Sequence, residues 1–479
     1  MASLLDNIAK PSAVVLQLSL VLGFIFVLLK VAQLYQERKK IIKALEAFPG
    51  PPRHWLYGHN HLVRRELEYP YAFPRWFGLL PIDQTLKQLI MSSLFVSLGK
   101  GLLTLNGAKW FQHRKLLTPA FHYDVLKPYV TLMSDSVKVM LDKWEKRNTQ
   151  RKTMEIFQDM SLMTLDTIMK CAFSYDTNCQ TQNHADFYIK AVYDLTYLVV
   201  QRIRTLSLSD VFYGMTRKGH QFQEACKLAH THTDKVIKER KLLLCNEKER
   251  EKILKKRHLD FLDILLCAKD EKGVGLSDED LRAEVDTFMF GGHDTTASGI
   301  SWLFYCMSLH PEHQQRCREE IQEILGERDT IEWEDLGKMT YTTMCIKESL
   351  RLFPPVPAVS RQLAKPITFS DGRSLPAGLF SLFICHAAVC HKWGTLIYDP
   401  MRFSPENSAQ RHSHAFLPFS AGSRNCIGQQ FAMNEMKVAL ALTLLHFELA
   451  PDPSRPPIPI SQIVLKSSNG IHLHLKKIR

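Results

Sequence analysis

The segment Phe419-Ser-Ala-Gly-Ser-Arg-Asn-Cys-Ile-Gly428 decides how this chain is interpreted. An apolar run ends in a turn, a cysteine follows, and an apolar-periodic helix is predicted from Ile427. Because a cysteine at a helix start meets free backbone N–H groups and the positive end of the helix dipole, we expect a lowered pKa and a thiolate at Cys426. Gly422 and Gly428 allow the backbone close to a large flat ligand, whose anionic edge Arg424 can meet. The alternative is a buried free cysteine in an ordinary turn.

A second motif, Gly291-Gly-His-Asp-Thr-Thr296, lies inside a predicted helix over 277–309. Each glycine costs a helix interior about 1 kcal/mol relative to alanine, so these positions should need them. Threonine hydroxyls can bond back to the preceding turn and open a local gap. Asp294 and Thr295 form an acid–alcohol pair able to relay protons to dioxygen in that gap, so they are the candidate catalytic residues. A kinked helix with a satisfied threonine is the alternative.

Two weaker motifs supply charged and aromatic side chains. Glu348-Ser-Leu-Arg351 places opposite charges on one helix face, and Arg402 is the expected third member of this group. Trp110-Phe-Gln-His-Arg114 offers an indole N–H and a guanidinium, both donors to an anionic ligand. Arg361 follows a proline-rich stretch and offers the same chemistry. Alone, an ExxR pattern is usually a surface ion pair, and an ordinary surface helix is the alternative for Trp110 and Arg114.

Together, these motifs resemble those of the cytochromes P450, whose FxxGxRxCxG pattern is complete here. The resemblance implies a mainly α fold with small β-sheets and an N-terminal transmembrane helix. It implies haem b with Cys426 as the iron ligand, the metal-binding residue of the chain. It assigns Glu348, Arg351 and Arg402 to a structural triad. The residues that it places around the haem are Trp110, Arg114, Gly291, Arg361, Phe419 and Arg424.

The stretch Phe288-Met-Phe-Gly-Gly-His-Asp-Thr-Thr296 resembles the family 4 version of this helix, and subfamily 4B in particular. Family 4 enzymes commonly carry a glutamate at the position of Gly291, and that glutamate forms an ester with the haem. Glycine cannot, so we expect noncovalent haem. Segments 77–99 and 390–398 are shorter than the family pattern, which puts substrate binding in doubt.

The N-terminal residues predict a membrane anchor. Ala13–Leu29 is an uncharged apolar run, about 26 Å long as a helix, enough for a thin bilayer. Because the stretch Gln36-Glu-Arg-Lys-Lys40, with its excess of basic residues, follows and no small-residue cleavage site does, an uncleaved anchor is favoured over a signal peptide. We expect an anchor at 1–30, a basic and proline-rich linker at 31–52, and a catalytic domain at 53–479. The domain would face the cytosol from the endoplasmic reticulum membrane.

Apolar periodicity and turn residues predict the remaining elements. The strand-like runs lie at 365–385 and 460–475. Besides 277–309, the predicted helices span 109–118, 127–147, 153–172, 222–256, 311–325, 340–353 and 427–446.

Composition excludes several other classes of protein. With 479 residues, 45% of them hydrophobic, the chain can bury a large core, so a disordered or fibrous protein is excluded. The net charge of +12 is accompanied by no nucleic-acid-binding motif, so no nucleic-acid partner is expected. The 11 cysteines form no CxxC pair, which indicates a reducing compartment. Zinc at 385–391 is disfavoured by the short ligand spacing.

We therefore expect a monooxygenase that inserts one oxygen atom into C–H bonds of lipophilic substrates. The resemblance implies NADPH-cytochrome P450 reductase as the electron donor, with cytochrome b5 as a further partner, and fatty acids hydroxylated at the ω carbon, or xenobiotics, as substrates. One alternative is a haem-thiolate isomerase that uses no reductant, although such enzymes generally lack the acid–alcohol pair. The other is an impaired splice variant that only binds haem.

Overall fold

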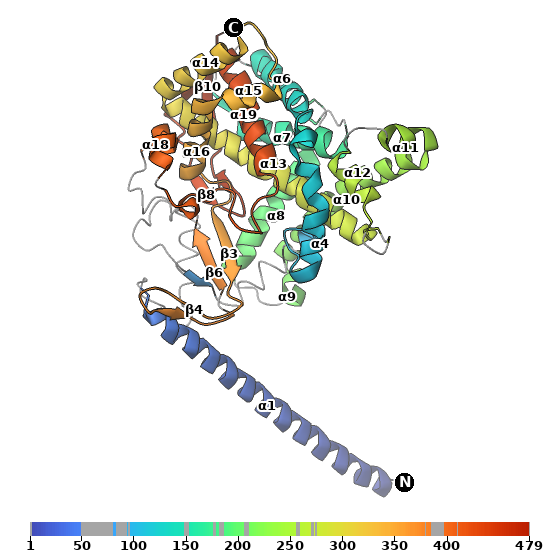
Figure 1. Ribbon diagram of the computed structural model, residues 1–479. Helices are drawn as coiled ribbons and strands as arrows, with labels where there is room; N and C mark the ends of the chain where they lie inside the picture. The colour runs from blue at the N-terminus through green and yellow to red at the C-terminus, as the bar shows by residue number, and fades with distance from the viewer. Residues whose placement is uncertain are drawn as a thin grey trace.

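Helix α13 (Asp278–Leu309) runs through the middle of the helical core, where several other helices pack against it (Figure 1). The computed structural model describes residues 2–48, 80–82, 93, 96–147, 153–175, 179–181, 186–205, 210–254, 259–269, 273, 275–378, 380–384, 397–409 and 411–478. The proline-rich residues 49–52, the zinc candidates at 385–391 and most of the two shortened segments lie outside these ranges.

The described helices are α1 (Ala2–Glu46), α4 (Gly107–Leu117), α5 (Tyr123–Leu126), α6 (Tyr129–Arg147), α7 (Phe157–Phe173), α8 (Asp186–Thr205), α9 (Asp210–Gly214), α10 (Arg217–Cys245), α11 (Glu247–Leu254), α12 (Phe261–Cys267), α13, α14 (Pro311–Leu325), α15 (Trp333–Lys338), α16 (Thr340–Leu352), α18 (Pro405–Ser408) and α19 (Gln429–His446). Short 3-10 turns lie at Thr118–Phe121, Pro400–Phe403 and Ser413–Ala415. The mainly helical prediction is therefore confirmed.

The strands form small antiparallel sheets at the edges of the helical core. Strand order is β1-β6-β3 in one sheet and β2-β10-β7 in another, with the two-stranded pairs β4-β5 and β8-β9. Their bounds are β1 (Leu80–Ile82), β2 (Met154–Glu155), β3 (Ala358–Gln362), β4 (Ile367–Thr368), β5 (Ser374–Leu375), β6 (Phe380–Ile384), β7 (Phe447–Pro451), β8 (Pro459–Ser461), β9 (Leu465–Ser467) and β10 (His472–Lys477).

Local sequence explains where α13 begins and ends. The Ser277 side chain accepts a hydrogen bond from the Asp280 backbone N–H at 3.1 Å, which caps the first turn. Pro311 begins the next helix, because proline is tolerated in a first turn but not in a helix interior.

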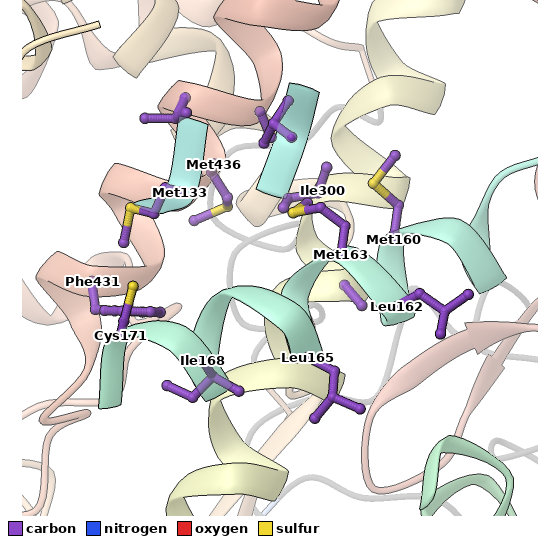
Figure 2. Close-up of a cluster of buried hydrophobic side chains, with 14 of the residues drawn as sticks. Met133, Met160, Leu162, Met163, Leu165, Ile168, Cys171, Ile300, Phe431 and Met436 are labelled. Carbon is purple, nitrogen blue, oxygen red and sulfur yellow. The ribbon is translucent and has the colours of Figure 1, made fainter. Parts of the chain in front are cut away.

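Helix α7 packs closely along α13, and a glycine makes that approach possible. A Cβ added at Gly292 would lie 2.8 Å from Cδ1 of Ile168. Figure 2 shows the apolar side chains on this side of the core, where Met163 of α7 lies near Ile300 of α13, and Ile168 lies further along α7. This packing accounts for one of the two glycines in the motif.

Helix α1 extends away from the rest of the chain (Figure 1) and contains the apolar stretch Val15–Gln33, which is long enough to cross a membrane. The described side chains of this stretch are exposed. The helix continues to Glu46, beyond the expected boundary at residue 30, and it includes the basic residues Arg38, Lys39 and Lys40. Near its end, Phe48 packs edge-on against Phe369 beside the β4-β5 pair.

Several predicted bounds were wrong. A helix was expected over 153–172, but residues 154–155 form a strand and the helix begins after them. The expected helix 222–256 is divided between α10 and α11 around Asn246. Helices α8 and α12 were not predicted at all.

Candidate active site

The cysteine loop forms a tight turn directly before α19. The Cys426 backbone N–H donates to the Phe419 carbonyl at 2.9 Å, and that of Asn425 donates to Gly422 at 3.0 Å. Gly422 has φ +78°, a left-handed conformation that glycine adopts without strain. The turn thus fixes Cys426 just ahead of Gly428, the N-cap of α19.

The expected sign of the Cys426 pKa shift is wrong for the free thiol. Burial raises its pKa, because desolvation outweighs the hydrogen bond from the Gly428 backbone N–H and the charge of Arg114, which both lower it. The side chain is nevertheless solvent-accessible, so the sulfur faces open space within dense surroundings. A thiol of this kind is deprotonated when it ligates a metal cation rather than beforehand.

Helix α4 brings Arg114 and Trp110 to the cysteine loop. Arg114 Nη1 donates to the Asn425 carbonyl and its Nη2 donates to Asn425 Oδ1, both at 2.8 Å. Arg424 lies over the Trp110 ring, 4.2 Å from its centroid. The two ends of the WxxxR motif therefore contact the two residues that directly precede Cys426.

The same end of α4 is tied to α13 by a buried pair. His113 Nδ1 lies 2.6 Å from Glu284 Oε1, and the other carboxylate oxygen accepts from the Leu102 N–H at 3.0 Å. This pair was not predicted from the sequence. A histidine and a glutamate on the apolar faces of two predicted helices could have indicated that they meet in the interior.

Arg361 of β3 also reaches the loop, since its Nη2 donates to Ser420 Oγ at 2.8 Å. Two guanidinium groups, those of Arg114 and Arg361, therefore contact the loop, and a third, that of Arg424, belongs to the loop itself.

On α13, Gly291 and Thr295 lie one turn apart on one face. The Thr295 hydroxyl donates to the Gly291 carbonyl at 2.7 Å, the back-bonding that the motif predicts, and its oxygen remains able to accept. A Cβ added at Gly291 would meet nothing within 4 Å, in contrast to Gly292. Gly291 thus borders open space.

Asp294 has a partner that sequence analysis missed. Its Oδ1 lies 3.0 Å from Nζ of Lys466 on β9, with each side chain 3% exposed. Oδ2 is buried without a hydrogen-bond partner among the described residues. The sequence feature that could have indicated this partner is Lys466 itself, which directly follows the apolar run Ile463-Val-Leu465.

Glu348, Arg351 and Arg402 meet in the interior. Arg351 donates to both oxygens of Glu348 at 2.7 Å, and Arg402 Nε lies 3.4 Å from Glu348 Oε1. Glu348 also accepts from the Asp399 N–H at 2.9 Å. Because Glu348 and Arg351 are completely buried, this is not the surface ion pair that an isolated ExxR pattern would suggest.

A small cavity of about 30 Å³ lies between α8, α10 and α13. Its walls are mainly apolar, with Phe290 from the motif-bearing helix and Ile463 from the β8-β9 hairpin.

Comparison with known proteins defines the class to which this fold and site belong. The family model "Cytochrome P450" matches residues 24–474, and the chain belongs to that family.

Several curated relatives match over nearly their whole length. Cytochrome P450 4A2 of Rattus norvegicus is 54% identical over 483 residues, covering 96% of this chain and 95% of that protein. Cytochrome P450 4B1 of the same species is 52% identical, covering 94% of each. Cytochrome P450 4A12B of Mus musculus aligns over 508 positions and all of both chains, so that alignment includes positions that this chain lacks. The family 4 prediction is confirmed, while the similar identities do not single out subfamily 4B.

The residues present fit the haem that this family binds. An accessible sulfur, open space beside Gly291 and three guanidinium groups match the iron, the ring edge and the anionic side chains of such a cofactor. The chain is a haem-dependent monooxygenase that receives electrons through NADPH-cytochrome P450 reductase and acts on lipophilic substrates.

Proposed function

We propose that this chain hydroxylates fatty acids at or near the ω carbon, and xenobiotics, using haem held noncovalently through Cys426. The family 4 relatives support the substrate class. When bound, the haem supplies dioxygen activation with electrons from the reductase. Cytochrome b5 is a second candidate electron donor.

The observation that carries this proposal is the placement of Asp294 and Thr295. Thr295 borders the open space beside Gly291 with an oxygen free to accept, and Asp294 is buried next to it in the chain. In our proposal, Asp294 takes up a proton from water and passes it toward the Thr295 hydroxyl, which holds it at the edge of the cofactor space.

The remaining residues position the cofactor. Trp110, Arg114, Arg361 and Arg424 would bind its anionic edge, and Phe419 would pack near the sulfur. Glu348, Arg351 and Arg402 would hold the chain that leads into the cysteine loop.

Helix α1 would anchor the chain in the endoplasmic reticulum membrane, with residues 53–479 forming a catalytic domain on the cytosolic side. The apolar stretch within this helix and the basic residues after it support this orientation.

The test is reconstitution of the purified full chain with reductase in lipid vesicles. We expect NADPH-dependent hydroxylation of a medium-chain saturated fatty acid, whereas equal turnover without reductase would favour an isomerase. Stoichiometric haem without any turnover would favour the impaired variant. Thr295→Ala should keep haem but divert reducing equivalents into hydrogen peroxide, and Thr296→Ala is the matched control. Unchanged coupling in Thr295→Ala would contradict the relay.

A further inference from the structure

The carboxylate of Asp294 is held asymmetrically. Its Oδ1 forms the ion pair with Lys466 at 3.0 Å, while Oδ2 is buried and without a hydrogen-bond partner in the described part of the chain. Burying a carboxylate oxygen without a hydrogen-bond partner costs free energy, so we expect a water molecule to donate a hydrogen bond to Oδ2. One oxygen is thus fixed and the other is free to exchange a proton.

Hydrogen bonds of the neighbouring backbone hold Lys466 in place. The adjoining Leu465 N–H donates to the Pro355 carbonyl at 2.8 Å, and the Leu465 carbonyl accepts from Ser298 Oγ at 2.6 Å. Ser298 follows Asp294 by one helical turn, so the two side chains lie on the same face of α13. Strand β9 is therefore attached to that face at two neighbouring points.

Aromatic rings complete the surroundings of the ammonium group. Lys466 Nζ lies 4.7 Å from the centroid of the Tyr193 ring on α8 and 5.7 Å from that of Phe157 on α7. Both rings favour a cation at this position. Since Lys466 is 3% exposed and already paired, it is not available to bind a substrate carboxylate.

We propose that Lys466 is a positioning residue for proton delivery, an inference that rests on the proposed relay through Asp294. Lys466 holds Oδ1 so that Oδ2 accepts a proton from a protonated water connected to bulk solvent and transfers it to the Thr295 hydroxyl oxygen, which releases its own proton toward the cofactor space. The carboxylate then returns to the charged form that pairs with the ammonium. No electrons move in this step. A carboxylate buried without a counter-ion would retain its proton instead of passing it on.

The test compares Lys466→Met with Asp294→Asn and the double variant in the haem-loaded, reductase-supported enzyme. The ratio of hydroxylated product to hydrogen peroxide should fall roughly tenfold in Lys466→Met, less than loss of a proton donor itself produces. Lys466→Arg should restore the ratio. The double variant should be no worse than Asp294→Asn, because both changes interrupt one path.

The matched control is Lys476→Met, which removes an exposed lysine paired with Glu448 at 2.9 Å on neighbouring β10. Its ratio should equal that of the unmodified chain. Haem content and the substrate-binding spectrum, measured in parallel, should be unchanged in Lys466→Met.

Two failures are distinguishable. If Asp294→Asn leaves the ratio unchanged, the relay itself is wrong. If Asp294→Asn lowers the ratio but Lys466→Met does not, or alters only substrate affinity, the role assigned to Lys466 is wrong. Additive effects in the double variant would also overturn it.

Discussion

Replacing Glu348 by glutamine tests the buried frame beneath the cysteine loop. Glu348 accepts two hydrogen bonds from Arg351 and one from the Asp399 N–H, and it also faces Arg402. Glutamine keeps the shape but removes the charge, and its amide group would direct N–H donors at a guanidinium that can only donate.

The magnitude follows from burial. Arg351 is 1% exposed, so its charge would remain in the interior without compensation. Removing one partner of a buried ion pair costs about 3 to 5 kcal/mol. This is a large part of the roughly 5 to 15 kcal/mol that stabilises a typical protein, so we expect poor haem incorporation as well as lower stability.

The assay is denaturant unfolding together with the haem-to-protein ratio of the purified variant. Glu334→Gln is the control, because its ion pair with Lys127 is similarly short but more than half exposed at both side chains. That change should cost much less stability, because an exposed ion pair is screened by solvent. Normal haem content in Glu348→Gln, with a loss no larger than in the control, would refute the assigned role.

Three further changes test separate parts of the molecule. Gly292→Ala should lower the free energy of unfolding, because overpacking against Ile168 costs about 1 to 3 kcal/mol, which exceeds the gain in helix propensity. Gly291→Ala is the control in the same unfolding assay and should be tolerated, because its Cβ would meet nothing within 4 Å. Acid extraction should release all haem from the unmodified chain, and retention would contradict the noncovalent link predicted from Gly291. Burial lowers the pKa of His232 from 6.5 to about 4, so the unfolded state takes up a proton first on acidification. Stability should fall by roughly 2 kcal/mol between about pH 7 and about pH 5, and a His232→Gln variant with an unchanged slope would exclude this group as the cause.

Local signals predicted most of the helical frame. The expected helix 277–309 matches Asp278–Leu309 because its ends depend on Ser277 and Pro311, which act on their neighbours in sequence. Helix α8 was missed because its amphipathic pattern carries neither a proline start nor a glycine end.

The site was predictable only in part. Motif spacing predicted Cys426 and the Asp294–Thr295 pair as site residues, but the Cys426 pKa depends on desolvation and on Arg114, which is distant in sequence. The partner of Asp294 is contributed by β9, whose contact with α13 no local pattern encodes. The role of Gly292 likewise became clear only from its distance to Ile168.

The carbon-monoxide difference spectrum of the reduced, purified protein tests the assignment of Cys426 most directly. We expect the Soret band of a thiolate-ligated haem in the unmodified chain, and its loss in a Cys426→Ala variant. A band typical of imidazole ligation, or an unchanged thiolate band in Cys426→Ala, would show that another side chain holds the iron.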